Sequence, residues 1–328
     1  MPSTKSRSAA VASPVRVSPN VAAALDAGRA VVALESSVFA QGLPQPSNRD
    51  AARRMLAAVR ARGAEPAITA VARGVPAVGL SDEELERFLA RDGVRKLSAR
   101  DLALAASAGA DGATTVAASL ALAHLAGIAV FATGGIGGVH RVAQSATHQA
   151  SAVHDESADL AELARTPMVV VSSGAKTILD LPATMERLES LGVAVVGYRT
   201  DELPGFLTRG TGISLAWRVD TAVEIAAAWR MQGQLGRTQA LLVVQQPPVE
   251  SALSRDMVDD AVARALTAAA RANVHGAALT PWLLSKVEQE TGGASLAANV
   301  ALLESNAALA AEIATEIAKP VEIGRAHA

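Results

Sequence analysis

The stretch that decides the fold is IAVFATGGIGGVHR, from Ile128 to Arg141. Its first part, residues 128–132, is a short apolar run, which is typical of a strand buried on both faces of a parallel sheet. Its second part is rich in glycine, which is typical of a tight loop. Ligands of open parallel sheets bind where the strands end. We therefore expect a core strand that leads directly into a functional loop.

The same alternation of apolar runs and helix-like segments continues on both sides of this stretch. It predicts a three-layer α/β/α sandwich, with a mostly parallel central sheet covered by helices on both faces. We expect residues 19–328 to form a single catalytic domain, and residues 1–18 to form a disordered tail. The other expected strands are at 31–34, 66–72, 75–80, 94–98, 168–174, 193–198 and 241–247. The expected helices are at about 47–62, 81–93, 98–109, 114–127, 176–191, 219–233, 254–273, 280–291 and 295–318.

The composition excludes several classes of protein. Among 328 residues, 30 Lys and Arg stand against 32 Asp and Glu, and this near-balance argues against a nucleic-acid or membrane-surface binder. The absence of cysteine excludes disulfides, thiolate zinc sites and cysteine nucleophiles, and it favours a cytoplasmic protein. Residues 1–18 lack the apolar segment of a secretory signal. The uncharged stretch 112–140 contains Thr, Ser and His, so a buried helix and strand explain it better than a membrane span.

Three charged residues follow or flank expected strands. Glu35 directly follows the apolar run VVAL, a position suited to a general acid or base; the alternative is a helix cap or an ion-paired core glutamate. Lys176, in SSGAK, is placed at a strand-to-helix junction, where a nearby cation and the helix end would lower its pKa and make it a nucleophile. Lys96, in RKLSARD, could pair with a phosphate. For both lysines the alternative is a solvated surface residue.

Two further segments are candidates for ligand binding. The glycines of residues 133–138 could leave backbone N–H groups open to a phosphate, with His140 adding charge; the alternative is a turn set by packing. Asp155 and Asp159 lie four residues apart, on either side of Ser157, so they could face one Mg²⁺ or Mn²⁺ ion or bind sugar hydroxyls. The alternative for this pair is a capping box at a helix start.

Taken together, nine segments occur in the order found in the pseudouridine-5′-phosphate glycosidases, the indigoidine-synthase-A-like family. They are VVALESS, GLPQP, KLSARDL, GATTVAAS, FATGGIGGVHR, SADL, GAKTILDL, TPWLL and TGGASLAAN. The chain resembles this family from about Ser18 to the last helix. The resemblance implies an α/β/α fold, a homotrimer, a divalent metal that is usually Mn²⁺, and reversible cleavage of the C–C glycosidic bond of pseudouridine 5′-phosphate to uracil and ribose 5-phosphate.

The resemblance also implies roles for individual residues. Glu35 takes the position of the proton donor and Lys176 that of the covalent nucleophile. Asp155 takes the metal-ligand position, and Asn299 matches an asparagine near the reacting group. The remaining positions implied to contact the substrate are Lys96, Val116, Ser157, Ala158 and Asp159, with His140 in the loop expected to hold phosphate.

The chain departs from the family pattern near this expected site. Gln41 stands where histidine is usual, Gln246 where asparagine is usual, and Ala294 where an acidic residue is common, while QSATHQASAV (144–153) lengthens a loop. Two alternatives follow. The same scaffold could cleave another C- or N-ribosyl phosphate, or it could bind phosphosugars without turnover. The retention of both Glu35 and Lys176 weighs against the second alternative.

Overall fold

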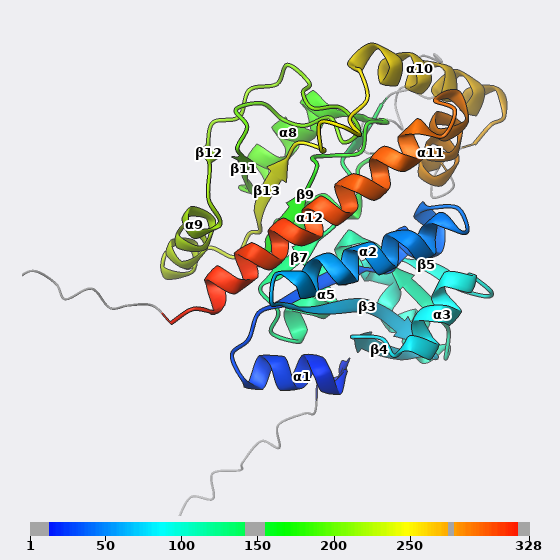
Figure 1. Cartoon of the computed structure of the whole chain (residues 1–328). Coiled ribbons are helices and arrows are strands. Elements are labelled where there is room, and N and C mark those ends of the chain that lie inside the picture. The colour runs from blue at the N-terminus through cyan, green and yellow to red at the C-terminus, as the bar shows by residue number, and fades with distance from the viewer. Residues whose placement is uncertain (1–12, 142–154, 275–278, 321–328) are drawn as a thin grey trace, which may run out of the picture.

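A mostly parallel sheet runs through the centre of the molecule (Figure 1). The computed structural model describes residues 13–141, 155–274 and 279–320. Only β3–β4 and β3–β6 are antiparallel within this sheet, and β5 (Arg95–Leu97) and β6 (Gly112–Thr114) pair with each other beside β3. The main path of the sheet is β1 (Arg16–Val17), β4 (Val75–Val78), β3 (Glu65–Ala72), β2 (Val31–Glu35), β7 (Val130–Ala132), β9 (Val169–Ser172), β13 (Leu241–Gln245), β11 (Ala194–Tyr198) and β12 (Arg218–Val219).

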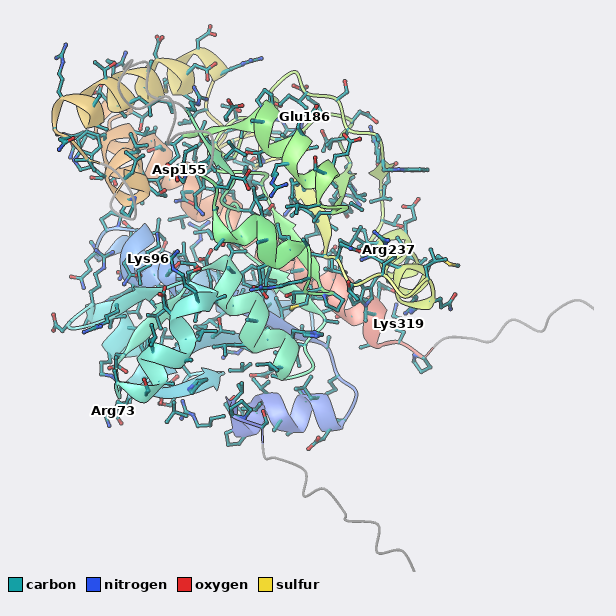
Figure 2. All side chains as sticks on the ribbon, turned by 180° about the vertical axis from the view of Figure 1, so that it is seen from behind. Arg73, Lys96, Asp155, Glu186, Arg237 and Lys319 are labelled. Atoms are coloured by element: carbon teal, nitrogen blue, oxygen red, sulfur yellow. The ribbon has the colours of Figure 1, made fainter. Side chains whose placement is uncertain are left out.

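Helices cover both faces of the sheet, which confirms the predicted fold class. On the face turned to the viewer in Figure 1, α2 (Ser47–Ala61) packs along α12 (Ala294–Ala318), and α12 also contacts β2, β7, β9 and α9 (Ala222–Gln234). On the face seen in Figure 2, α5 (Val116–Leu125) packs against β2 and α7 (Ala158–Leu163). The other helices are α1 (Pro19–Asp26), α3 (Asp82–Ala90), α4 (Leu102–Ser107), α8 (Leu181–Ser190), α10 (Arg255–Arg271) and α11 (Leu279–Glu290).

The strand sequences explain why the sheet has two covered faces. Every residue of β2, β7, β9 and β13 is buried, as expected for central strands that read as continuous apolar runs. The apolar helix α12 is long enough to cross a membrane by length and composition, but 56% of its most apolar window is buried inside this fold. It therefore behaves as the core helix of the sandwich.

Three expected boundaries are wrong. Arg16 and Val17 form β1 against β4, so these two residues of the expected tail belong to the sheet. Gly112–Thr114 form strand β6, and the helix expected from residue 114 begins at Val116 instead. The helix expected from Lys176 begins at Leu181, because Asp180 caps it by accepting a hydrogen bond from the Ala183 N–H at 3.0 Å.

A buried asparagine joins the carboxyl ends of three neighbouring strands. Asn306 is fully buried on α12, and its Nδ2 donates to the carbonyl oxygen of Thr133 at 2.8 Å, just after β7. Its Oδ1 accepts from Nε2 of Gln245 at 2.8 Å, at the end of β13, and Ser173 Oγ, after β9, lies 3.2 Å from Nδ2. A single amide thus fixes α12 against β7, β9 and β13.

We predict that Asn306→Leu lowers the free energy of unfolding by about 2–4 kcal/mol, because it leaves buried polar groups unpaired at about 1–3 kcal/mol each. Urea unfolding of the purified variant measures this change. Asn20→Leu, at an exposed position on α1, is the control and should change stability by less than about 0.5 kcal/mol. Equal effects of the two substitutions would contradict the role assigned to Asn306.

Candidate active site

Glu35 is the last residue of β2 and is held by two hydroxyl groups. Ser37 Oγ donates to its Oε2 at 2.7 Å, and Thr133 Oγ1, from the segment after β7, donates to its Oε1. The Glu35 side chain is 5% exposed, so its orientation is fixed by these donors rather than by solvent. The carboxyl group is therefore positioned at the carboxyl edge of the sheet, where the sequence pattern placed it.

Lys176 lies on a segment that runs beside the glycine-rich stretch. Beyond the strands, the pairing of β7 with β9 continues: Ser173 N donates to Gly134 O at 2.9 Å, and Lys176 N donates to Ile136 O at 3.1 Å. Residue 176 precedes α8 by several positions and is not at the start of that helix. The expected effect of a helix end on the Lys176 amine is therefore wrong, and its position comes from this backbone pairing.

The glycines of residues 133–138 lie in a closely packed stretch. The N–H groups of Ile136, Gly137, Val139 and His140 donate to protein oxygens at 2.8–3.0 Å, so these four are not open to a phosphate. A Cβ at Gly135 would lie 2.7 Å from the Phe206 ring, and one at Gly138 would overlap the side chain of Thr184. Close packing therefore explains why glycine is needed at these two positions, and phosphate binding by the other N–H groups of the stretch stays a prediction.

Asp159 is buried and bridges the glycine-rich stretch to α5. Its Oδ2 accepts from Gly137 N at 2.8 Å, and its Oδ1 accepts from Ala117 N, in the first turn of α5, at 2.9 Å. Ser157 caps α7, and its Oγ accepts from Asp159 N at 3.2 Å. Asp159 thus positions the start of α5 beside the glycine-rich stretch.

Buried hydroxyl groups fix the other side of α5. Thr69 Oγ1 lies 2.8 Å from Thr114 Oγ1 and donates to Ser119 Oγ at 2.8 Å, while Thr114 N donates to Ser36 Oγ at 2.9 Å. This network joins β2, β3, β6 and α5 directly behind Glu35. Val116, the first residue of α5, is buried at the junction.

Lys96 on β5 is exposed to solvent, but many protein atoms surround its amine and partly desolvate it. Desolvation there is the largest cause that lowers the pKa of Lys96, and the positive charge of Lys176 lowers it further. The negative charges of Glu35 and Asp159 act in the opposite direction. The four expected site residues Glu35, Lys96, Asp159 and Lys176 are therefore close enough for their charges to interact.

His140 and Asp155 form a pair at the margin of this group. His140 Nδ1 lies 3.1 Å from Asp155 Oδ1, and His140 N donates to the Asp155 carbonyl oxygen at 3.0 Å. The Asp155 side chain is half exposed, whereas Asp159 is buried. Asp155 precedes α7, so the two carboxylates do not share one face of a helix, and a metal site formed by both of them stays a prediction. Figure 2 marks both Lys96 and Asp155 on the side of the molecule where α10 and α11 lie.

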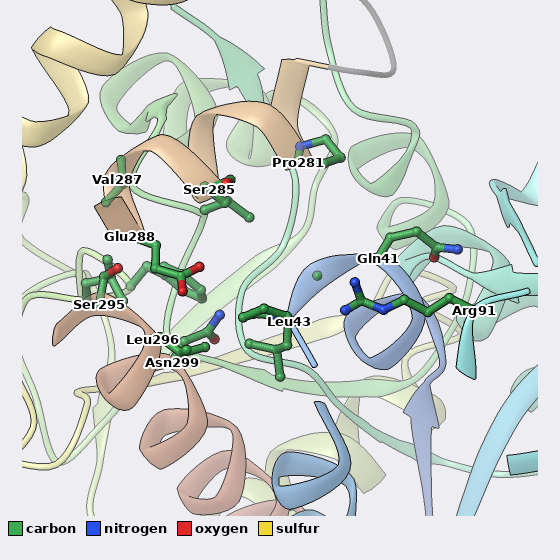
Figure 3. Close-up of a pocket in the computed structure, with 15 residues that line it drawn as sticks. Gln41, Leu43, Arg91, Pro281, Ser285, Val287, Glu288, Ser295, Leu296 and Asn299 are labelled. Atoms are coloured by element: carbon green, nitrogen blue, oxygen red, sulfur yellow. The ribbon is translucent and has the colours of Figure 1, made fainter. Parts of the chain in front are cut away.

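Asn299 lies on α12, in the wall of a cavity of about 170 Å³ (Figure 3). The cavity is also lined by Gln41 of the π-helical turn η1 (Val38–Gly42), by Arg91 after α3 and by Phe206. Because Phe206 packs against the glycine-rich stretch at Gly135, the cavity adjoins the segment that carries Lys176. Among the remaining expected residues, Ser157 is half-buried and Ala158 is exposed.

Two residues that sequence reasoning missed complete the site. Thr133, quoted only as the start of the glycine-rich stretch, orients Glu35 through its hydroxyl group. Asn306, in the middle of an alanine-rich helix, forms the hydrogen bonds to the strand ends described above. A lone polar residue on the apolar face of a helix was the available signal for Asn306. The sequence would also allow a mixed histidine and carboxylate metal site with His148 and His154, which both lie outside the described residues.

We predict that Lys96→Met is more stable than the wild-type protein at pH 7. The folded-state pKa of Lys96 lies below its unfolded value of about 10.4, so the unfolded chain binds more protons between the two values. Wild-type stability should therefore rise with pH through that window and approach that of Lys96→Met above it. Urea unfolding at neutral and alkaline pH measures this change, which should be small because Lys96 is solvent-accessible.

Lys319→Met, at the exposed end of α12, is the control for removal of a lysine. It should show no gain in stability at pH 7. A stability difference between wild type and Lys96→Met that stays the same at all pH values would contradict the shifted pKa.

Known proteins are similar in sequence to this chain over nearly its whole length. Residues 20–316 match the family described as indigoidine synthase A like protein. The chain is 59% identical over 302 residues to a pseudouridine-5′-phosphate glycosidase from Gemmatimonas aurantiaca, covering 92% of this chain and 96% of that protein. It is 49% identical to one from Herpetosiphon aurantiacus, covering 93% and 98%.

Two solved structures are also similar, each with a TM-score of 0.83 and each covering 93% of this chain and 97% of its own. One, at 37% identity, is a prealnumycin C-glycosynthase in complex with ribulose 5-phosphate. The other, at 33% identity, is an indigoidine synthase A-like protein from Thermotoga maritima. With a family match across nearly all of its length and relatives at this level of identity, the chain belongs to the indigoidine synthase A-like family.

Proposed function

We propose that this protein is a pseudouridine-5′-phosphate glycosidase, which reversibly cleaves the C–C glycosidic bond to give uracil and ribose 5-phosphate. The single observation that supports this most is the convergence of Glu35, Lys96, Asp159 and Lys176 at the carboxyl edge of the sheet. The 59% identity to a protein of that name supports the same substrate.

In the first half of the proposed reaction, Lys176 acts as the nucleophile and Glu35 transfers protons. A carbon leaving group departs poorly, so direct hydrolysis of the C-nucleoside is slow. We propose that the Lys176 ammonium first gives a proton to the Glu35 carboxylate. The resulting amine attacks C1′ of the ribose, forming a C–N bond and breaking the bond from C1′ to the ring oxygen. Glu35 gives its proton to that oxygen and then recovers one from the new ammonium group. The ribose is now open and attached to Lys176.

The second half of the reaction releases the base. Glu35 protonates C5 of the uracil ring, and the nitrogen lone pair of Lys176 then forms an iminium with C1′ while the C1′–C5 bond breaks. Water adds to the iminium and releases ribose 5-phosphate with the free lysine. The hydroxyl groups of Ser37 and Thr133 support this role for Glu35, because they hold its carboxyl group in one orientation through both proton transfers.

We propose that Lys96 holds the 5′-phosphate together with the start of α5 at Val116. Thr115 N donates to Leu97 O at 2.9 Å, so β5 and the start of α5 lie side by side. The N-terminus of a helix carries partial positive charge, which favours an anion. The desolvated Lys96 cation, repelled by Lys176, would gain from the same anion. Ser157, Ala158 and Asp159 would contact the substrate beside this position, since Asp159 accepts from Gly137 N. His140, which is paired with Asp155, would add charge near the phosphate.

We also propose a divalent cation, Mn²⁺, held by Asp155. Within the described parts of the chain no three His, Asp or Glu side chains form a metal cluster. The half-exposed Asp155 carboxylate fits a hard cation that keeps most of its waters, since such ions bind through one or two carboxylates. When bound, the ion would supply positive charge near the phosphorylated substrate.

We propose in addition that the protein is a homotrimer in the cytoplasm. The exposed apolar side chains of Trp217, Val223 and Leu235, around β12 and α9, support contacts between copies of the chain.

A second candidate function is C-glycosylation with another acceptor on the same scaffold. The structural similarity to a prealnumycin C-glycosynthase favours keeping it, as do Gln41, Gln246 and Ala294. Gln246 is half-buried and donates to Arg209 O at 2.8 Å, and Ala294 is the first residue of α12. Of the three departures only Gln41 lines the cavity beside Asn299.

We predict that the protein converts pseudouridine 5′-phosphate to uracil and ribose 5-phosphate, and that borohydride added during turnover attaches the sugar to Lys176. Peptide mass analysis locates the label. Lys176→Ala should lose about 10³-fold or more in turnover, as for loss of a covalent nucleophile. Lys286→Ala, on α11, is the matched control and should retain activity. A label on Lys96, or activity without any label, would overturn the assignment.

We predict that Asp155→Asn weakens Mn²⁺ binding at least 10-fold, because the charged ligand is lost while the shape is kept. Electron paramagnetic resonance of free Mn²⁺ measures binding without the need for turnover. Glu156→Gln is the matched control, since Glu156 pairs with Arg187 and should leave Mn²⁺ affinity unchanged. Wild-type affinity in Asp155→Asn would show that the cation, if present, is held elsewhere.

A further inference from the structure

The cavity beside Asn299 has walls of opposite charge. In Figure 3 the Arg91 guanidinium points into it from one side, and the Glu288 carboxylate faces it from α11 on the other. Within the described residues, neither side chain forms an ion pair. Two unpaired opposite charges on facing walls suit a neutral ligand that carries both hydrogen-bond donors and acceptors.

Arg91 is held in an unfavourable state on three counts. Its φ is +73°, a left-handed conformation that L-residues rarely adopt, at the end of α3. Its Nε and Nη2 are shielded from solvent and have no hydrogen-bond partner among the described residues. Desolvation lowers its pKa. Strained residues with unmet hydrogen bonds concentrate at functional sites, because a ligand can supply what the protein does not.

Gln41 provides the complementary unmet group. Its Nε2 donates to Val94 O at 3.2 Å, but its Oε1 is shielded and has no partner among the described residues. Figure 3 shows the Gln41 and Arg91 side chains next to each other on the same wall of the cavity. This wall therefore offers donors from a guanidinium and an acceptor from an amide, side by side.

We propose that this cavity receives the pyrimidine ring of the substrate, and that Arg91 and Gln41 determine the specificity for the base. The guanidinium of Arg91 donates to a ring carbonyl oxygen, and Oε1 of Gln41 accepts from the adjacent ring N–H. Rotations of the Arg91 and Gln41 side chains turn the shielded donors of one and the shielded acceptor of the other toward the ring. This inference rests on the proposed glycosidase function and adds to it the residues that recognise the leaving group.

Size and position agree with this assignment. A cavity of about 150 Å³ can hold one benzene ring, so a volume of about 170 Å³ is large enough for a single six-membered ring. The contact of Phe206 with Gly135 places the cavity beside the segment of Lys176, where the leaving base must lie. An acceptor without a carbonyl oxygen beside a ring N–H would leave Arg91 and Gln41 unpaired, so the chemistry of the cavity favours uracil over such an acceptor.

The test compares Arg91→Met with Arg91→Gly. Both remove the guanidinium, and glycine also relieves the left-handed backbone. We expect uracil, as a product inhibitor in the presence of ribose 5-phosphate, to bind about 10- to 100-fold more weakly to both variants, the loss expected for one charge-assisted hydrogen bond. Binding of ribose 5-phosphate alone should not change. Gln41→Leu should weaken uracil in the same way.

The matched controls are Arg73→Met and Arg73→Gly, because Arg73 also has a positive φ, of 47°, and is exposed away from the cavity. They should leave uracil binding unchanged. Melting temperature separates recognition from structure: Arg91→Gly should melt at or above the wild-type temperature if Arg91 serves the ligand, and a lower value would overturn the proposal.

The two levels of the proposal fail in different ways. No turnover of pseudouridine 5′-phosphate by the wild-type protein would defeat the proposed function itself. Normal turnover with undiminished uracil binding in both Arg91 variants would leave the function standing and overturn the assignment of this cavity. Equal weakening of uracil and ribose 5-phosphate would also overturn it, since it would place Arg91 outside a dedicated base site.

Discussion

The amide of Asn306 is the interaction on which the geometry of the site depends. It joins α12 to the carboxyl ends of β7, β9 and β13, three strands that are neighbours in the sheet but far apart in sequence. From these ends the chain continues into the segments that carry Thr133 and Lys176. A buried network of hydrogen bonds in which every polar group has a partner is rigid, because any movement leaves a polar group unpaired in a low-dielectric interior. The strand ends are therefore fixed before any ligand arrives.

Charge distribution is the second constraint on the site. Two lysines and two carboxylates gather at one edge of the sheet, and neither lysine forms an ion pair with them among the described residues. The carboxylates instead accept hydrogen bonds, Glu35 from hydroxyl groups and Asp159 from backbone N–H groups. Lys96 is thus left to interact with an anionic substrate and Lys176 to react with it, while the acids are held in place. Such preorganised charge is effective because little reorganisation is needed when the substrate binds.

Within one family, the chemistry at the sheet edge and the recognition of the base come from different parts of the fold. Glu35 and Lys176 belong to segments that leave central strands, whereas Gln41, Arg91 and Asn299 come from η1, the end of α3 and the start of α12. The side chains on η1, at the end of α3 and at the start of α12 lie outside the central strands, so they can vary without disturbing those strands. This separation explains how a glycosidase and a C-glycosynthase can share a fold at a TM-score of 0.83.

The sequence by itself determined the order of strands and helices, because continuous apolar runs such as VVALE and MVVVS can only be strands covered on both sides. It also indicated Glu35, since the residue after a central strand must lie at the carboxyl edge. The capping box of α3 at Ser81 was likewise readable from local sequence. These features depend on neighbours within a few positions.

Only the tertiary structure decided how the site is held together. Asp155 and Asp159 look alike in sequence, yet one is half exposed beside His140 and the other is buried under backbone N–H groups. The glycines after β7 look like an anion loop, but Phe206 and Thr184 occupy the space that a side chain would need. Asn306 is marked in the sequence only as a lone polar residue in an apolar helix, and Arg91 carries no local signal. Each of these roles is set by contacts with residues distant in sequence, and no local pattern encodes such contacts.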